Sequence, residues 1–289
     1  MAENVVLIVG GAGGVGSALV RRLVDQGRKV VATAQLPEEA LAIESQYDRA
    51  VKCHAVDLAD ADAALVALRD IVSGLDSLNA VAVCAAIAPP GPAELTPLST
   101  FRRAYEINCV SEVAIYQAVM PALRKTRGRI VLIGSLAGRM AFTFMSAYAA
   151  TKFALEGLCD VMRREAAPQG VKISLIQPGG IRTNLVYQQF IDVRRDLAAL
   201  NEEQMSRYGH LYEAHLKLSE ASMEANSSTP EQVADVVLEA LEADEPKVRY
   251  VVGQDAEDFI KMTKTLSDEE IDGLFSRLYS GEAGLFVGR

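Results

Sequence analysis

The sequence predicts a parallel, doubly wound α/β sheet with helices on both of its faces. A short and fully apolar segment, Val5–Val9, opens the chain, as in a strand that is buried on both sides. A glycine-rich turn follows it, and short apolar segments then alternate with segments of helical periodicity. Such units in a row imply parallel strands joined by helical crossovers. The predicted strands are residues 5–9, 29–33, 51–56, 79–84, 129–133, 172–176 and 247–252.

The first unit contains a candidate phosphate-binding turn. Five glycines occur within the segment Gly10–Gly16, between the first strand and a helical pattern. Bare backbone lets a phosphate approach, and a helix N-terminus offers N–H donors and the positive end of a dipole. This context favours nucleotide binding over a plain tight turn, although the first gap between the glycines is one residue longer than in the dinucleotide fingerprint. The predicted contacts are Gly10, Gly14, Val15 and Gly16.

The ends of the next two strands indicate how the rest of a dinucleotide would be held. The second strand ends in Ala34-Gln35, where the adenosine ribose usually lies. An acidic residue that would repel a 2′-phosphate is missing there, which favours NADP(H), although the neutral Gln35 leaves NAD(H) possible. The third strand ends in Asp57-Leu58. Asp57 could accept a hydrogen bond from an adenine amino group, or it could cap the next helix.

Small residues follow the fourth strand, and a polar residue lies inside the long helix after it. Ala85 and Ala86 would let a ligand approach the backbone closely. The helix predicted over residues 99–123 carries Asn108 in an otherwise apolar stretch. Asparagine is unfavourable in a helix interior, and a buried amide needs partners. Asn108 is therefore either a structural hydrogen-bonding residue or a polar group turned toward a site.

Three further polar residues suggest acid/base chemistry. Ser135 lies at the carboxyl end of the fifth strand, the edge at which open α/β sheets bind ligands. Tyr148 and Lys152 are four residues apart in the following helix, which places them on one face. A nearby cation favours the phenolate and lowers the pKa of a tyrosine from its usual value of roughly 10. Such a pair could exchange protons near neutral pH, although the same spacing also occurs on solvated helix faces.

Taken in order and spacing, these residues resemble those of the short-chain dehydrogenase/reductase family of the Tyr-x-x-x-Lys type. The resemblance is in register over about residues 4–185 and continues loosely to about 255. It implies a single Rossmann-like domain over residues 1–289 with a seven-stranded parallel sheet. It also implies binding of NAD(P)(H) and interconversion of alcohols and carbonyls. The residues that carry it are the glycine turn, Asp57, Asn108, Ser135, Tyr148, Lys152 and Pro178-Gly179-x-Ile181-x-Thr183.

The resemblance implies a role for each of these residues. Tyr148 would exchange a proton with the substrate oxygen, and Ser135 would polarise that oxygen. Lys152 would hold the nicotinamide ribose and lower the pKa of Tyr148, while Asn108 would hold a water molecule of the proton relay. Two hydroxyl donors would stabilise the negative charge that builds on the oxygen during hydride addition. The cofactor contacts would also include Tyr148, Lys152, Ala85, Ala86, Pro178, Gly179, Ile181 and Thr183.

Two departures from the family pattern bear on cofactor binding. Val9 precedes the glycine turn, where a threonine is common in the family. Val83-Cys84-Ala85-Ala86 stands where the family usually has Asn-Asn-Ala-Gly, which removes a hydrogen bond between strands and adds a methyl group beside the cofactor ribose. We expect weaker or shifted cofactor binding rather than none. The departures also leave open a non-catalytic descendant that binds the cofactor as a sensor.

The last third of the chain is expected to shape a substrate pocket. Residues from about 184 to 228 are helical in character and rich in Met, Leu and Tyr. The family has its substrate lid here, and this composition indicates an apolar pocket for a steroid, retinoid, fatty acyl or aromatic ketone. A packing arm at a dimer surface is the alternative. Arg249-Tyr250-x-Val252-Gly253 resembles bacterial members related to steroid and retinol dehydrogenases, and a charged helical tail over about residues 254–289 follows. Within that tail, Gly284–Val287 could dock on a neighbouring chain.

Composition narrows the possible partners. The formal net charge of −9 and the pI near 5.0 argue against nucleic-acid and anionic-membrane surfaces. No apolar run reaches the roughly 18 residues of a membrane span. The N-terminus lacks the positive segment of a signal peptide, which indicates the cytoplasm, and Cys and His form no metal-binding pattern.

These observations together predict an oxidoreductase. We expect hydride transfer between NADP(H) and an apolar ketone or secondary alcohol, with Tyr148 as the acid/base. An NAD-dependent alcohol dehydrogenase of the same family is the alternative. Because the family is usually dimeric or tetrameric, we expect a homodimer or homotetramer assembled through the helices that carry Asn108 and Tyr148.

Overall fold

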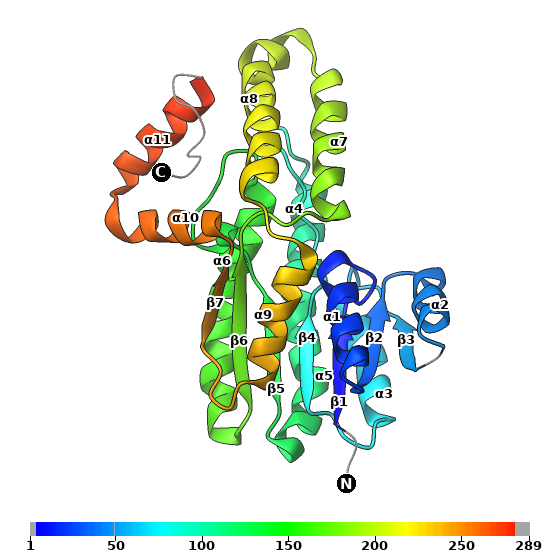
Figure 1. The fold of residues 1–289 in the computed structure, drawn as a ribbon. Helices are drawn as coiled ribbons and strands as arrows, with labels where there is room; N and C mark the ends of the chain where they lie inside the picture. The colour runs from blue at the N-terminus through cyan, green and yellow to red at the C-terminus, as the bar shows by residue number, and fades with distance from the viewer. Residues whose placement is uncertain (1–3, 49, 281–289) are drawn as a thin grey trace.

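The computed structural model describes residues 4–48 and 50–280 (Figure 1). Within these residues, seven parallel strands form one sheet in the order β3-β2-β1-β4-β5-β6-β7. The α/β fold class and the parallel sheet predicted from the sequence are confirmed. The strands are β1 (Val5–Val9), β2 (Lys29–Ala34), β3 (Val51–Ala55), β4 (Ala80–Val83), β5 (Arg129–Ile133), β6 (Lys172–Pro178) and β7 (Arg249–Val252).

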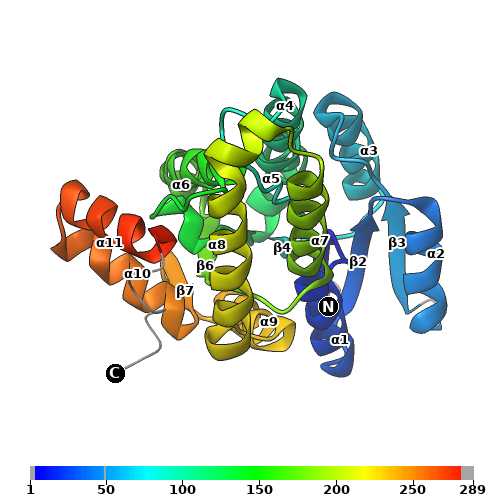
Figure 2. The ribbon, with the colours of Figure 1, turned by 90° about the horizontal axis from the view of Figure 1, so that it is seen from above.

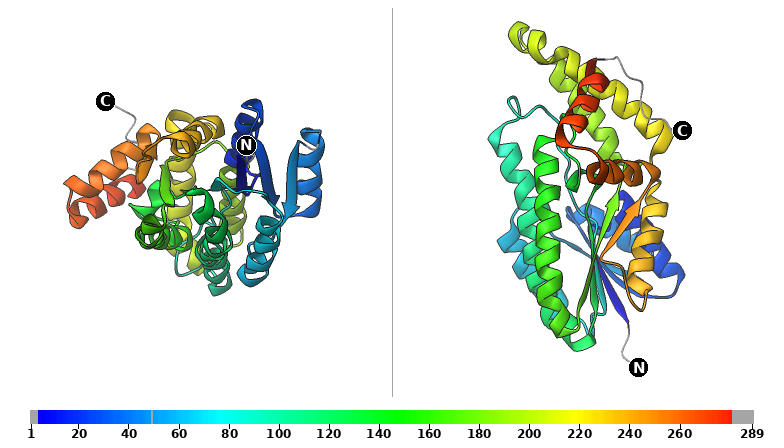
Figure 3. Two further views of the ribbon diagram at one scale, coloured as in Figure 1. Left: turned by 90° about the horizontal axis from the view of Figure 1, so that it is seen from below. Right: turned by 90° about the vertical axis from the view of Figure 1, so that its left-hand side faces the viewer.

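Helices cover both faces of the sheet, which Figure 3 shows edge-on in its right-hand view. One face is covered by α3 (Ala61–Ser73), α5 (Ser111–Thr126) and α6 (Ser146–Ala166), and α4 (Leu98–Tyr105) packs against α6. The other face is covered by α1 (Gly14–Asp25), α2 (Pro37–Gln46) and α9 (Pro230–Glu242). Among the described helices, none has the length and apolar character that crossing a membrane requires.

Strand β1 is shared between the two hydrophobic cores. Val5, Leu7 and Val9 pack on the side of α3 and α5, and Val6 and Ile8 pack on the side of α1 and α9. All five side chains are fully buried, which explains why this strand is apolar throughout instead of alternating. Burial of each such side chain contributes roughly 1.5–3 kcal/mol. The strand therefore gives the glycine turn that follows it a rigid base.

The strand order brings two loops together at the carboxyl edge of the sheet. After β1 the chain moves outward through β2 and β3, and it then returns to β4 on the other side of β1. The loops that follow β1 and β4 are consequently neighbours, and the backbone N–H of Cys84 donates to the carbonyl of Val9 at 2.8 Å. Open parallel sheets bind ligands where the strand order reverses in this way.

The prediction of one uninterrupted helix over residues 99–123 is wrong. Helix α4 ends at Tyr105, and a π-helical turn over Glu106–Val110 precedes α5. At its end the backbone N–H of Ser111 donates to the carbonyl of Glu106, five residues earlier. The apolar periodicity continues through this turn, so the pattern could not reveal it. Asn108 lies within the wider turn, and such insertions occur often at functional sites.

Four helices rise above the carboxyl edge of the sheet. Figure 2, seen from above, shows α7 (Asn184–Ala198) and α8 (Glu202–Asn226) lying over the middle strands. These helices comprise most of the segment predicted as a lid. Helices α10 (Gln254–Thr265) and α11 (Asp268–Ser280) follow β7, and α11 contacts α8. The predicted docking segment Gly284–Val287 lies outside the described residues.

Candidate active site

The glycine turn after β1 is shaped by the loop that faces it. Gly10 has a φ of +85°, and a Cβ atom there would lie 2.7 Å from the backbone nitrogen of Ala85. Gly16 meets a different constraint, because a Cβ atom there would collide with the carbonyl of Gly10. Helix α1 then begins at Gly14 without a side-chain cap on its first N–H groups. These donors and the helix dipole make the turn a suitable anion site.

The side chain of Asp57 lies at the mouth of the site beside Gln35. It accepts hydrogen bonds from the Gln35 amide at 3.4 Å and from the backbone N–H of Ala59 at 3.0 Å. It does not cap the next helix. The cap of α3 is Asp60, whose carboxylate accepts from the backbone N–H of Ala63 at 3.0 Å. The capping alternative for Asp57 is therefore wrong, and its carboxylate stays exposed at the cavity.

Glu39 brings to the end of β2 a negative charge that the sequence reasoning missed. Its carboxylate accepts from the backbone N–H groups of Gln35 and Leu36, each at 3.1 Å, and it lines the same cavity as Gln35. Ala34 also lines the cavity but carries only a methyl group, so Gln35 and Glu39 are the long polar side chains that a ligand would meet here. An acidic residue is thus present at this end, in the first turn of α2 instead of on the strand.

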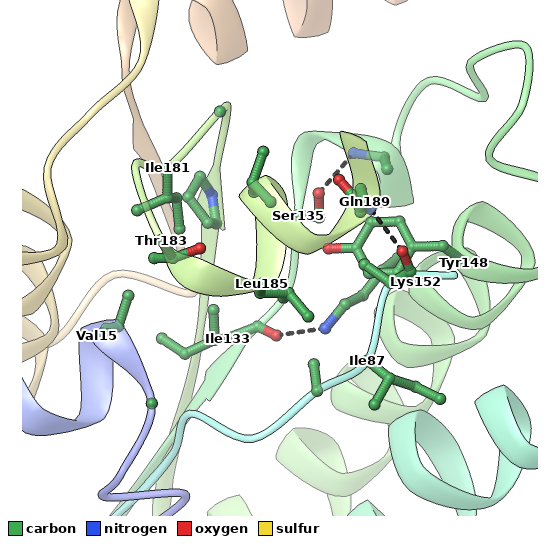
Figure 4. A pocket seen from close by; sticks show the side chains of 18 of the residues that line it. Val15, Ile87, Ile133, Ser135, Tyr148, Lys152, Ile181, Thr183, Leu185 and Gln189 are labelled. Atoms are coloured by element: carbon green, nitrogen blue, oxygen red, sulfur yellow. Dashed lines mark hydrogen bonds between the residues drawn. The ribbon is translucent and has the colours of Figure 1, made fainter. Parts of the chain in front are cut away.

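Ser135, Tyr148 and Lys152 come together at the carboxyl end of β5 (Figure 4). The ammonium of Lys152 donates to the carbonyl of Ile133 at 2.8 Å and lies 5.7 Å from the centre of the Tyr148 ring. The hydroxyl oxygen of Ser135 accepts from the backbone N–H of Ala137 at 3.0 Å, which fixes its side chain. In Figure 4 the phenol oxygen of Tyr148 and the Ser135 hydroxyl point toward the same space.

Both amide donors of the Asn108 side chain and its oxygen are hydrogen-bonded within the protein. Its Oδ1 accepts from the backbone N–H of Ile87 at 3.0 Å, and its Nδ2 donates to the Ile87 carbonyl at 2.8 Å and to Thr151 Oγ1 at 3.0 Å. The structural alternative is therefore correct for this side chain. The bonds tie the loop after β4 to α6, one residue before Lys152. Asn108 does not line the cavity.

Asp255, at the start of α10, holds the loop that follows β6. Its carboxylate accepts from the backbone N–H of Gly180 at 2.7 Å and from that of Ala256 at 2.9 Å. Burial raises the pKa of this carboxyl in spite of these hydrogen bonds. A Cβ atom at Gly179 would collide with the same carboxylate, so the glycine is needed for this contact. Nothing in the spacing connects Asp255 with this loop, and the sequence reasoning missed it.

One continuous cavity of about 660 Å³ extends from the glycine turn to the helices above the sheet. Every residue predicted to touch substrate or cofactor lines it, except Gly16 and Asn108. Glycine backbone and the polar residues form one end. The other end is mostly apolar. It is lined by Phe142 and by residues from the last third of the chain, including Leu185, Phe190, Met223, Phe259, Phe275 and Leu278.

The apolar end is closed by contacts between segments far apart in the sequence. The ring of Phe142 meets those of Phe259 and Phe275 edge to face, with centroid distances of 5.2 and 5.6 Å. The segment predicted as a tail is consequently a wall of the cavity. On the lid, the side-chain amide of Gln189 in α7 donates to the carbonyl of Ala88 at 2.6 Å, which closes the lid onto the loop after β4 (Figure 4).

Comparison with known proteins agrees with this arrangement. The family model "short chain dehydrogenase" matches residues 4–193, more than half of the chain. The chain belongs to the short-chain dehydrogenase family. Matched relatives are named as reductases or dehydrogenases, which confirms the prediction of an oxidoreductase.

The relatives of this short-chain dehydrogenase differ in their named substrates. The chain is 28% identical to 3-amino-tetrahydro-pyrrolizinone reductase of Xenorhabdus hominickii, over 95% of this chain and 96% of that protein. It is 38% identical to human 11-beta-hydroxysteroid dehydrogenase type 2, over 56% of this chain and 41% of that protein. A short-chain dehydrogenase from Burkholderia cenocepacia, solved in complex with NADP, superposes with a TM-score of 0.72 at 19% identity and covers 96% of this chain and 98% of its own.

The departure from the family pattern at residues 83–86 leaves the sheet of this short-chain dehydrogenase intact. Val83 is buried in the core, and β4 stays joined to β1 by the bond between Cys84 and Val9 described above. Ala85 and Ala86 both line the cavity beside the glycine turn. The methyl group that Ala86 adds therefore lies on the wall of the cavity.

Proposed function

We propose that this short-chain dehydrogenase transfers a hydride between NADP(H) and an apolar ketone or secondary alcohol, with Tyr148 as the acid/base. The observation that carries the proposal is the shared space in front of the Tyr148 and Ser135 hydroxyls, beside the buried Lys152. This space lies between the polar and the apolar ends of one cavity. When bound, a nicotinamide would supply or accept the hydride, and the residues of the chain would position it and move protons.

The hydrogen bonds around the two hydroxyls favour donation of a proton from the protein to the substrate oxygen. Since the oxygen of Ser135 accepts from Ala137, its own O–H is available to donate to a substrate oxygen. Tyr148 would give its proton to that oxygen as negative charge develops there. The phenolate left behind would be stabilised by the ammonium of Lys152, which faces the same ring.

The residues present fit a dinucleotide. The turn around Gly10 offers backbone donors at the start of α1 for a diphosphate. Lys152 is only 2% exposed and uses one of its three donors on Ile133, so two remain for ribose hydroxyls. Backbone groups of the loop from Pro178 to Thr183 line the cavity next to this lysine and would meet the nicotinamide.

The preference for NADP(H) rests on the absence of an acid at the end of β2. Glu39 counts against it, because its charge lies beside Gln35 and would repel a 2′-phosphate. Glu39 therefore favours the NAD(H)-dependent alternative. Among the solved structures of this fold, the Burkholderia protein is in complex with NADP.

An apolar substrate is supported by the walls of the cavity and by the relatives. Phenylalanine, leucine and methionine side chains form the end opposite the glycine turn. Two relatives are named for a steroid and for a bicyclic pyrrolizinone, both ring compounds.

We also propose a homodimer or homotetramer through the helices α4 to α6. Four large apolar side chains on α4, on the π-helical turn and on α6 are about half exposed in the single chain, and a partner subunit could cover them. They are Tyr105, Val110, Phe153 and Val161.

The test is the substitution Tyr148→Phe, which removes the phenol hydroxyl group and keeps the ring. We expect the turnover of ketones with NADPH or NADH to fall by roughly two orders of magnitude or more, while cofactor affinity stays nearly unchanged. Tyr187→Phe, on the exposed side of α7, is the matched control. Undiminished turnover in Tyr148→Phe would refute the catalytic role. A wild type that binds cofactor but converts no ketone or alcohol of a broad panel would favour the non-catalytic sensor.

A further inference from the structure

His215 is a buried polar residue in the apolar end of the cavity. It lies on the face of α8 that lines the cavity, together with Leu218, Ser219, Ser222 and Met223. Only 8% of its surface is exposed, and its ring stacks on Phe144 with a centroid distance of 4.9 Å and an interplanar angle of 17°. A buried imidazole needs hydrogen-bond partners, and these determine what the ring can offer to a ligand.

The hydrogen-bonding groups around His215 are arranged to suit one tautomer. The hydroxyl of Tyr279 in α11 donates to the carbonyl of Thr143 at 3.4 Å, so its proton is already used. His215 Nδ1 lies 3.3 Å from the same hydroxyl oxygen, so in the tautomer that keeps the bond to Thr143, Nδ1–H is the donor in that pair. The lone pair is then on Nε2, where Ser219 Oγ approaches only to 3.5 Å. Because burial lowers the pKa of His215 to about 4, the ring is neutral at pH 7 and Nε2 is an acceptor.

The position of His215 along α8 sets its distance from the reacting end. Met223, on the same face, lies against the loop after β6, with its sulfur 3.4 Å from the place of a Cβ atom on Gly180. Eight residues separate Met223 from His215, and a helix rises about 1.5 Å per residue, so the two lie roughly 12 Å apart along the axis. A ligand that reaches from this loop to His215 needs an extended body, and the wall between them is apolar.

We propose that His215 and Ser219 form a second recognition point, which binds a hydroxyl group at the end of the substrate opposite its reacting carbon. His215 Nε2 accepts the hydrogen bond from that hydroxyl, and the Ser219 hydroxyl can donate to its oxygen. Tyr279 is a positioning residue that holds the tautomer. This inference rests on the proposed function and narrows its substrate class to extended, apolar ketones or secondary alcohols that carry a second, remote hydroxyl.

The test is a binding comparison with two ligands that differ only in this hydroxyl. Dihydrotestosterone is a rigid ring ketone with a hydroxyl at its far end, and androstanone is the same ketone without it. We expect the wild type to bind dihydrotestosterone about tenfold more tightly, as one well-placed hydrogen bond predicts. In His215→Phe, which keeps the stacking on Phe144, the preference should disappear while the affinity for androstanone is retained. Tyr279→Phe should reduce the preference, and the control Ser206→Ala, at an exposed position of α8 away from the cavity, should leave it unchanged.

Three outcomes would overturn the inference. They are equal affinity for both ligands in the wild type, a preference that persists in His215→Phe, and failure of both ligands to bind. Because the readout is equilibrium binding by calorimetry, it does not depend on turnover. A hydroxyl preference without any reduction of ketones would keep the recognition point and refute the oxidoreductase proposal. Reduction of ketones without a hydroxyl preference would support the oxidoreductase proposal and refute the recognition point. If His215→Phe does not fold, Ser219→Ala and Tyr279→Phe test the same preference.

Discussion

Asp255 accepts a hydrogen bond from the backbone N–H of Gly180 at 2.7 Å and thereby joins α10 to the loop after β6. This loop carries Ile181 and Thr183, two predicted cofactor contacts that line the cavity. A carboxylate beyond the last strand therefore fixes the loop between the polar and the apolar ends of the site. Helices α10 and α11 contribute to the site twice, through this contact and through their aromatic side chains.

Removing this contact should weaken cofactor binding. In Asp255→Ala the partly buried N–H of Gly180 loses its acceptor, which costs roughly 1–3 kcal/mol and releases the loop. We expect the Kd of the nicotinamide cofactor to rise about tenfold, measured by fluorescence titration. Asp255→Asn keeps an acceptor oxygen and should have a smaller effect. Asp258→Ala, on an exposed turn of the same helix, is the control. A Kd that does not change in Asp255→Ala would show that the loop is held by other contacts.

Cofactor preference should respond to the charge at the end of β2. Glu39→Gln removes the negative charge beside Gln35, and we expect the affinity ratio of NADP(H) to NAD(H) to increase by about an order of magnitude. Gln35→Arg should increase it further, because a guanidinium can bind a 2′-phosphate directly. Glu38→Gln changes the neighbouring exposed residue and is the matched control. If the affinity ratio of NADP(H) to NAD(H) equals the wild-type ratio in all three variants, the adenosine ribose lies elsewhere.

The sheet and the polar end of the site could be predicted because their residues act locally. A few neighbouring residues determine the structure of each of these features. They are the strand Val5–Val9, the turn after it and the helical spacing of Tyr148 and Lys152. The π-helical turn at Asn108 was missed because its insertion leaves the apolar pattern unbroken.

The apolar end of the site could not be predicted because it is made of contacts across long stretches of chain. Phe142 meets Phe275, and Asp255 meets Gly180, only through the way α10 and α11 fold back on the sheet. An amphipathic pattern shows that such a helix has a buried face, but it does not say which surface covers that face.

The bond between Gln189 and Ala88 should hold the lid closed. Gln189→Leu removes the donor to the Ala88 carbonyl and leaves the apolar shape nearly unchanged. We expect KM for ketone substrates to increase about fivefold, which corresponds to one net hydrogen bond, with kcat equal or higher because the lid opens more readily. Gln188→Leu is the control, because the exposed side chain of Gln188 donates to Asp192 in the same helix and does not line the cavity. A loss of kcat without a change in KM would instead assign Gln189 to the chemical step.

Glu112 combines nearly complete burial with an unsatisfied carboxyl group. It is 3% exposed, and its Oε2 has no hydrogen-bond partner among the described residues. Burial raises the pKa of this carboxyl to about 8, although the charge of Lys152 acts to lower it. Helix α5 thus carries, one turn after Asn108, an acid that keeps its proton at neutral pH.

The free energy of unfolding should therefore fall with increasing pH in a range that Glu112 sets. The folded state holds a proton that the unfolded chain loses above its ordinary pKa of 4.5, so stability decreases from that pH up to about 8 and then levels off. Glu112→Gln is neutral at every pH and removes this decrease. We expect it to stabilise the protein by on the order of 2–4 kcal/mol at pH 9 and by little at pH 4.5. Urea unfolding across this range measures the difference, with the exposed Glu213→Gln as control. A stability difference between Glu112→Gln and wild type that is constant with pH would show that the carboxyl is already ionised, and paired or hydrated, in the folded protein.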